Sequence, residues 1–244
     1  KQSSLGSGFI IDAAQGLVIT NHHVVAHATE VQVSLVDKKT YDAKILGLDP
    51  KLDLALLKIR DKDSSKAPTG LKAVSLGDSD KVRIAEPVFA VGNPFSLQHT
   101  VTVGIISAKN RTIGIGPFDN FLQTDASINP GNSGGALVNL KGELIGMNTA
   151  IYSPSGGSVG IAFAIPSKTV NDVVSQLRTG GSVNRGWLGV KIDPASRPLV
   201  LDKPLFAELS KRTSPDILPV EDLRAVAGVV VIAAAAAGNG QARR

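Results

Sequence analysis

The sequence predicts a mainly β fold of many short strands, which is typical of a β-barrel or a β-sandwich. The chain has 244 residues, and 43% of them are hydrophobic, which is enough for a substantial core. Its 25 glycines and many Val and Ile residues favour strands joined by tight turns. Short apolar or alternating runs, separated by turn residues, also recur up to about residue 165.

The strands expected in the first half follow from these runs. Residues 8–20 (GFIIDAAQGLVIT) read as two strands around a turn at Gln15-Gly16. Residues 31–36 alternate, and 41–49 form a further strand. Residues 53–59 (DLALLKI) are nearly continuous and apolar, as expected of a buried strand.

The second half predicts strands at 86–94, 100–110 and 158–166, and a hairpin at 136–151 around Lys141-Gly142. The period then changes to that of a helix over 167–180, with Ser167 expected to cap its start and Gly180 to end it. One face of this helix is apolar: Val170, Val173, Val174 and Leu177.

A domain boundary is expected near 180–185, after which the pattern weakens. Residues 185–244 contain turn prolines, one strand-like run at 228–233 and a string of alanines. About sixty residues with so few core candidates make a poor independent core. We therefore expect a first domain over 1–182 and a second, incomplete unit over 185–244.

Composition excludes several classes of function. The chain has no Cys, which rules out disulfides, Cys-based zinc sites and a cysteine nucleophile. Its net charge of +5 is spread without a dense Lys/Arg stripe, so a nucleic-acid groove is not expected. No apolar run approaches the roughly 20 residues of a membrane span. No signal peptide is recognised at Lys1, and an exported protein in mature or truncated form would look the same.

Three residues of different types predict nucleophilic serine chemistry. Ser133 lies in GNSGG, His23 follows a strand in ITNHHVV, and Asp53 is a carboxylate at the start of an apolar strand. A serine nucleophile needs a base, and the base needs an acceptor on its other ring nitrogen. Buried carboxylates are costly unless partnered, which suits Asp53 to that role. The order His, Asp, Ser is that of the chymotrypsin template and fits a cleft between two barrels.

The glycines around Ser133 allow a sharp turn that could aim the N–H groups of Gly131 and Ser133 at one point, as an oxyanion hole requires. A plain turn serine is the alternative interpretation. A zinc site using His23 and His27 is disfavoured, because no HExxH arrangement and no Cys accompany them. No metal or other cofactor is expected, and His22, His27 and His99 are interpreted as groups at the surface or as groups that support the site without touching the substrate.

The motifs resemble, in their order, those of the HtrA/Deg family of serine proteases, from about Gly6 to Val190. The motifs that carry the resemblance are GSGFIID, VITNHHVV, DLALLKI, AVGNPF, VTVGIISA, FLQTDASINPGNSGGALVN and GIAFAIP. The similarity is closest to bacterial periplasmic members, so it implies a periplasmic location. It also implies a trypsin-like double β-barrel with a C-terminal helix, followed by a partial PDZ domain.

The resemblance assigns roles to residues. His23, Asp53 and Ser133 match the family's catalytic triad, and Gly131, Asn132 and Ser133 match its oxyanion-hole segment. The walls of the primary specificity pocket are matched by Ile128, Asn148, Thr149, Ala150 and Ile151. These walls carry no charge at the base, so small aliphatic P1 residues are expected. Leu188, Gly189 and Val190 match a PDZ carboxylate-binding loop, and 228–233 matches a later PDZ strand.

The resemblance implies ATP-independent cleavage of unfolded proteins by a trimer-based oligomer, with PDZ peptide ligands as further partners. The loops at 109–120 and 151–160 are similar to regulatory loops of the family, and we expect them to order and complete the oxyanion hole. The alternative function is a holdase that binds unfolded chains without cutting them. The intact His, Asp and Ser set favours proteolysis.

Overall fold

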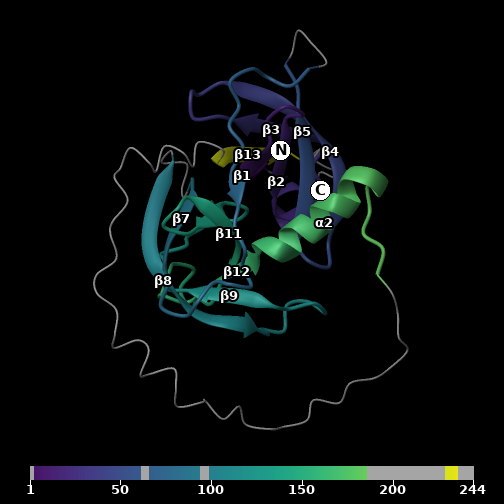
Figure 1. Cartoon of the computed structure of the whole chain (residues 1–244). Coiled ribbons are helices and arrows are strands. Elements are labelled where there is room, and N and C mark those ends of the chain that lie inside the picture. The colour runs from purple at the N-terminus through teal and green to yellow at the C-terminus, as the bar shows by residue number, and fades with distance from the viewer. Residues whose placement is uncertain (1–2, 62–65, 94–98, 186–228, 236–244) are drawn as a thin grey trace, which may run out of the picture.

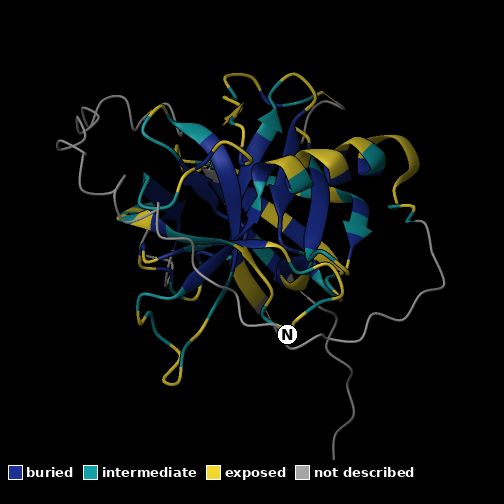
Figure 2. Cartoon of the chain, turned by 60° about the horizontal axis from the view of Figure 1, so that its bottom comes forward, coloured by how far each residue is buried: buried dark blue, intermediate teal, exposed yellow. Residues whose placement is uncertain are grey.

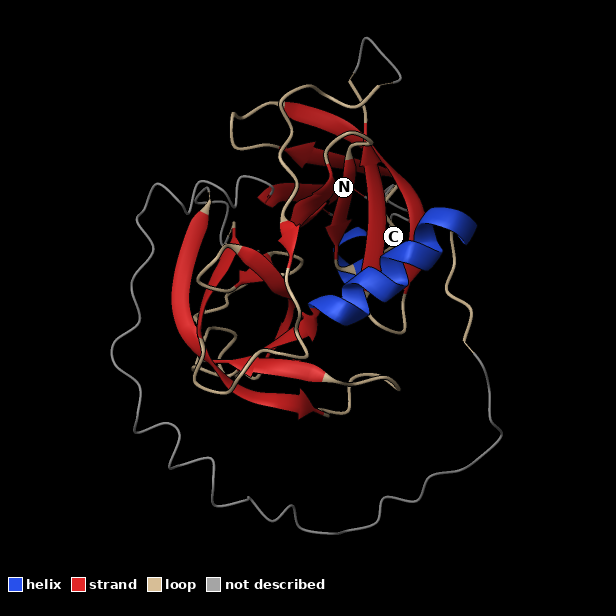
Figure 3. Cartoon of the chain, viewed as in Figure 1, coloured by secondary structure: helices blue, strands red, loops and turns tan. Residues whose placement is uncertain are grey.

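The structure is a computed structural model that describes residues 3–61, 66–93, 99–185 and 229–235. Within these residues it is mainly β, with two β-barrels side by side and one long helix lying across them (Figure 1, Figure 3). The prediction of a trypsin-like double barrel with a C-terminal helix is confirmed. None of the described helices is long and apolar enough to cross a membrane.

Six antiparallel strands close the first barrel, in the order β1-β13-β3-β4-β5-β2. The turn between β1 and β2 contains Gly16 with φ of 66°, a left-handed conformation that suits glycine. All four residues of β2 and five of the six in β5 are buried, which agrees with the continuous apolar run predicted for 53–59. The strands are β1 (Ser3–Asp12), β2 (Leu17–Thr20), β3 (Glu30–Ser34), β4 (Thr40–Asp49), β5 (Leu54–Ile59) and β13 (Val229–Ala235).

The strand-like run near 228–233 forms a strand as predicted, but not as part of a PDZ-like unit. β13 pairs antiparallel with β1 on one side and with β3 on the other, so it closes the first barrel. Val230, Ile232 and Ala234 are buried in that barrel. The division into domains at 185 stays a prediction, because residues 186–228 lie outside the described residues. Leu188, Gly189 and Val190 of the expected peptide-binding loop lie outside them too.

The second barrel follows the order β10-β7-β8-β9-β12-β11 and closes because β10 also pairs with β11. The predicted hairpin at Lys141-Gly142 joins β10 to β11, and Gly142 has φ of 73°. The short β6 (Ser75–Leu76) adds to β11 in parallel. The strands are β7 (Pro87–Gly92), β8 (Thr100–Arg111), β9 (Phe121–Thr124), β10 (Ala136–Val138), β11 (Glu143–Ile151) and β12 (Ala162–Pro166).

Helix α2 (Ser167–Gly180) contacts strands of both barrels and buries the four apolar residues predicted for its inner face. Its bounds match the predicted helix over 167–180, but its capping interactions differ from the prediction. Ser167 donates its hydroxyl to Gly77 O at 2.8 Å instead of capping the helix, and the left-handed C-cap is Gly181, with φ of 70°. One core cluster joins Phe9 of the first barrel, Phe163 of the second and this helix face. Figure 2 shows buried residues gathered inside the barrels and the outer face of α2 exposed.

Candidate active site

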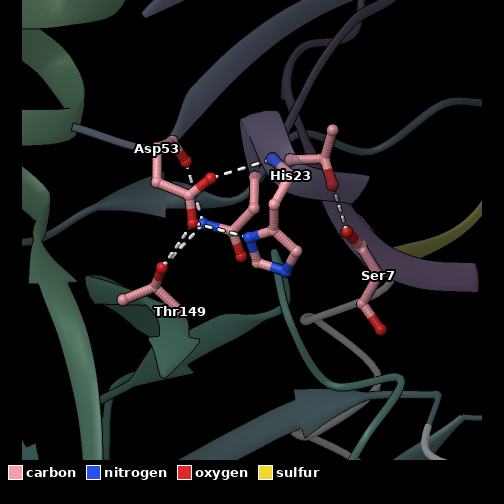
Figure 4. A network of polar contacts seen from close by, with 6 residues as sticks. Ser7, His23, Asp53 and Thr149 are labelled. Atoms are coloured by element: carbon pink, nitrogen blue, oxygen red, sulfur yellow. Dashed lines mark hydrogen bonds and ion pairs between the residues drawn. The ribbon is translucent and has the colours of Figure 1, made fainter. Parts of the chain in front are cut away.

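His23 lies in the short helix α1 (His22–Val25), which follows β2 directly. Val24 and Val25 are buried and fix this turn against the first barrel, while the His23 side chain keeps 49% of its surface exposed. Its Nδ1 lies 2.7 Å from Asp53 Oδ2, and its backbone N–H donates to Asp53 Oδ1 at 2.9 Å (Figure 4). Both carboxylate oxygens of Asp53 therefore contact His23, which sets the orientation of the ring.

Asp53 occupies a left-handed backbone conformation, with φ of 55°, immediately before β5. Its carbonyl accepts hydrogen bonds from the His22 N–H at 3.1 Å and from Asn21 Nδ2 at 2.9 Å. A non-glycine residue holds this conformation only where its surroundings impose it, and such residues cluster at functional sites. Here the segment 21–23 supplies the constraint, and it is also the segment that carries the imidazole.

The pKa of the Asp53 carboxyl lies below its ordinary value. Burial raises this pKa, but the hydrogen bonds and charge of His23, together with the hydroxyl of Thr149, lower it by more. Asp53 is therefore ionised at neutral pH. An ionised carboxylate next to Nδ1 favours the imidazole tautomer with its proton on Nδ1, which leaves Nε2 able to accept a proton.

Thr149 is predicted to lie in a pocket wall, and that role stays a prediction. Its side chain is only 7% exposed, and its hydroxyl donates to Asp53 Oδ2 at 2.8 Å. The same hydroxyl accepts a hydrogen bond from Asn21 Nδ2 at 3.0 Å. Thr149 thus supports the carboxylate from the second barrel. No sequence signal indicated this contact, because Thr149 lies 96 residues from Asp53 along the chain.

Ser7 of β1 holds the loop that contains Ser133, and sequence reasoning missed it. Its backbone N–H donates to Ser133 O at 2.8 Å, and its hydroxyl donates to Gly131 O at 2.6 Å. The hydroxyl also accepts from the Asn93 N–H at 2.8 Å, and Ser7 O accepts from the hydroxyl of Thr20 at 2.7 Å. Ser7 is fully buried and lies near His23 (Figure 4), so these contacts fix the loop against the first barrel.

Gly134 makes this close approach possible. Its φ is 84°, and an added Cβ would lie 2.2 Å from Ser7 O and 2.5 Å from the hydroxyl of Thr20. Only glycine fits such a contact in such a conformation. The backbone after Ser133 is therefore packed against Thr20 and Asn21, immediately before His22 and His23. The structure thereby brings the loop of Ser133 next to the segment that holds His23 and Asp53.

The segment predicted as an oxyanion hole forms a tight turn. The Asn132 N–H donates to Asn129 O at 3.0 Å, with Pro130 and Gly131 in the central positions. Gly131 has φ of 104°, and proline followed by a glycine with positive φ is the signature of a type II turn. Within the described part of the chain, neither the Gly131 N–H nor the Ser133 N–H donates a hydrogen bond. Their role in binding an oxyanion stays a prediction.

The side chain of Asn132 does not reach the place where the Gly131 and Ser133 N–H groups would bind an oxyanion. It is 1% exposed and packs against Gly92, where an added Cβ would lie 2.4 Å from Asn132 Oδ1. The contribution of Asn132 to the turn is therefore its backbone.

The two segments predicted to wall a pocket lie side by side. Asn148 accepts the Gly134 N–H at its carbonyl, at 2.8 Å, and donates its own N–H to Gly135 O at 2.9 Å. Ile128 is 3% exposed and Ile151 packs against the same cluster. The Asn148 side chain is only 1% exposed, so the interactions seen here for this residue are the backbone hydrogen bonds with Gly134 and Gly135. The pocket role of these residues and of Ala150 stays a prediction.

The other histidines are predicted to lie at the surface or to support the site from outside it. His22 is half-buried and His27 is exposed, with φ of 63° at His27. Across the described ranges, no cluster of three or more His, Asp or Glu side chains could hold a metal ion.

The sequence and the fold are both similar to those of known proteins. Residues 6–147 match the family described as trypsin-like peptidase domain. The chain is 52% identical over 204 residues to a "Probable periplasmic serine endoprotease DegP-like" of Brucella suis biovar 1, covering 83% of this chain and 38% of the relative. It is 52% identical over 191 residues to the periplasmic serine endoprotease DegP of Salmonella typhimurium, covering 78% and 39%. The chain thus spans about two fifths of the length of these relatives.

Solved structures agree with these relatives. The HtrA-type protease AlgW with a tripeptide matches with a TM-score of 0.72 and 49% identity, covering 78% of this chain and 61% of that one. AlgW with a decapeptide matches with a TM-score of 0.70 and 48% identity, covering 77% and 56%.

Proposed function

Because the chain belongs to the trypsin-like peptidases, and within them to the HtrA/Deg family of serine proteases, we propose that it is a serine endopeptidase. The observation that carries this proposal is the contact of both Asp53 carboxylate oxygens with His23, next to the packed loop of Ser133. A pure binding protein has no need of this arrangement.

Each residue of the proposed triad has a role in forming and hydrolysing an acyl-enzyme. The Ser133 hydroxyl attacks the peptide carbonyl while His23 Nε2 takes its proton, and His23 later returns that proton to the leaving amine. Asp53 accepts the Nδ1–H and stabilises the imidazolium that forms. The N–H groups of Gly131 and Ser133 bind the oxyanion, whose charge develops only in the transition state. Water then releases the acyl group by the same steps.

The preferred substrates we propose are unfolded polypeptides with small aliphatic residues at P1, cleaved without ATP. Ile128 is buried in an apolar cluster against which Ile151 packs, and neither predicted wall carries a charge, so a charged P1 side chain would lose its hydration without gaining a partner. The names of the relatives support a location in the bacterial periplasm. A trimer-based assembly and PDZ peptide ligands are further proposals from family membership, and sedimentation analysis would test the first.

The direct test is cleavage of reduced casein by the chain and by two serine variants. Ser133→Ala should abolish cleavage. Ser127→Ala, at an exposed serine in the same segment, should retain it. Cleavage that persists in Ser133→Ala would refute the role of Ser133. If none of the three proteins cleaves casein but all prevent it from aggregating, the chain is a holdase and not a protease.

A further inference from the structure

One hydrogen bond ties the glycine-rich loop over residues 152–160 to the segment before Ser133. The Ser158 N–H donates to Asn129 Oδ1 at 3.0 Å. The other hydrogen bonds of the loop are internal or close its base. Ser153 Oγ donates to Gly157 O at 2.6 Å and the Gly160 N–H donates to Ser158 Oγ at 3.4 Å, while the Tyr152 N–H donates to Ile161 O at 3.0 Å. Among the hydrogen bonds of the described residues, the contact with Asn129 is thus the one that joins the loop to a segment away from its own base.

Asn129 is bound at its backbone as well. Its carbonyl accepts the Asn132 N–H at 3.0 Å and closes the type II turn that presents the Gly131 N–H. One residue therefore holds the turn of the oxyanion hole with its main chain and the loop after β11 with its side chain. Asn129 is half-buried, so water competes only partly for the side-chain bond.

The two predicted walls of the primary pocket are consequently tied at two places. Close to Ser133, the backbone of Asn148 is hydrogen-bonded to Gly134 and Gly135, in the stretch of chain that continues from Ile128 past Ser133. Further away, Asn129 joins the first wall to Ser158, in the loop that continues from the second wall. If only the hydrogen bonds of Asn148 were present, the 152–160 loop could move away from the Ile128 segment. A P1 side chain would then lose packing contacts in the pocket.

We propose that Asn129 is a positioning residue that sets the P1 selectivity of the enzyme by anchoring the 152–160 loop through its side-chain oxygen. The inference rests on the proposed peptidase function. It concerns substrates whose P1 side chain fills the pocket, and not the attack of Ser133 itself. A substrate with glycine at P1 leaves the pocket empty and does not depend on the anchor.

The test compares kcat/KM for two peptides that differ only at P1, one with Val and one with Gly. Asn129→Ala is expected to lower kcat/KM for the Val peptide about 3- to 10-fold, the range for loss of one such hydrogen bond, with little change for the Gly peptide. Asn129→Asp retains an oxygen that accepts the Ser158 N–H. Its added charge acts on both peptides alike, so the Val/Gly ratio should stay at the wild-type value. A merely structural defect would lower both rates together.

Asn139→Ala provides a matched control, because Asn139 Oδ1 also accepts backbone N–H groups at a turn, from Lys141 at 2.9 Å and Glu143 at 3.0 Å. That turn lies at the opposite end of β11 from the 152–160 loop, so the ratio should not change. If the wild type is active and Asn129→Ala has an unchanged Val/Gly ratio of kcat/KM, the role of Asn129 is refuted but the proposed peptidase function is not. A wild type that cleaves neither peptide would overturn the proposed function and the selectivity claim with it.

Amide hydrogen exchange at Ser158 gives a readout that is independent of activity. Exchange at this N–H should be faster in Asn129→Ala than in the wild type, but not in Asn129→Asp. Equal exchange in the wild type and Asn129→Ala would also refute the role of Asn129 as an anchor.

Discussion

Replacing Thr149 by Val removes one hydroxyl and keeps the shape of the side chain. The hydroxyl donates to Asp53 Oδ2 at 2.8 Å in a site where Thr149 is 7% exposed. Hydrogen bonds to charged groups contribute about 1.5–3 kcal/mol. The Asp53 side chain is 28% exposed, which places the expected loss at the lower end, about 1.5 kcal/mol. A loss of this size in transition-state stabilisation corresponds to roughly tenfold in kcat/KM.

The pH dependence of unfolding gives an independent check on this contact. The folded pKa of Asp53 is lowered below 3.8, and Thr149 is one of the causes. A carboxyl with a depressed folded pKa adds stability above its unfolded pKa, and this stability is lost as the pH falls through the folded pKa. The difference in free energy of unfolding between wild type and Thr149→Val should therefore be largest near neutral pH. It should shrink as the pH falls below 3.8.

The assay combines initial rates on a Val-P1 peptide with urea unfolding at a series of pH values. Thr149→Ser keeps a hydroxyl at the same position and serves as the matched control, with kcat/KM close to wild type. Two results would refute the reasoning: Thr149→Val with wild-type kcat/KM, or an unfolding difference that stays constant from neutral pH down to about pH 2, well below the normal range of a carboxyl.

Three further variants test the packing that builds the site. Gly134→Ala should destabilise the fold by about 3 kcal/mol or more in urea unfolding, because its Cβ would lie 2.2 Å from Ser7 O at a φ of 84°; a loss under about 1 kcal/mol would contradict this. Arg185→Met should lower the free energy of unfolding by about 3–5 kcal/mol, because Asp49 is 2% exposed and both its carboxylate oxygens bind the Arg185 guanidinium. An unchanged Tm would refute this expectation. Deleting residues 229–244 should leave β1 and β3 with unpaired edges and promote further association, which light scattering would detect. A deletion variant with the same particle size and stability as the wild type would show that β13 is dispensable.

The sequence predicted the triad because each member carries a local signal. Asp53 is a charge at the head of an apolar strand, His23 follows a strand end, and Ser133 is enclosed by glycines. The residues that position them carry none. Ser7 acts on a carbonyl 124 residues away, and Thr149 on a carboxylate 96 residues away. A serine in a strand or a threonine after an asparagine is ordinary in sequence, and only the packing of the two barrels gives either residue a partner.

The difference between a local sequence signal and a long-range contact also explains why residues 228–233 were wrongly assigned to a PDZ-like unit. Alternation and β-branched residues predict that a run will be a strand, but they do not say which edge it will join. In the structure the edges of β1 and β3 need a partner between them, because an unpaired edge leaves a row of backbone N–H and C=O groups without hydrogen bonds. β13 satisfies both edges, and its register sets Val231 opposite Ser7 on β1. Ser7 in turn holds Gly131 and Ser133. The strand interpreted as part of a separate domain is therefore the neighbour of the strand that supports the proposed nucleophile.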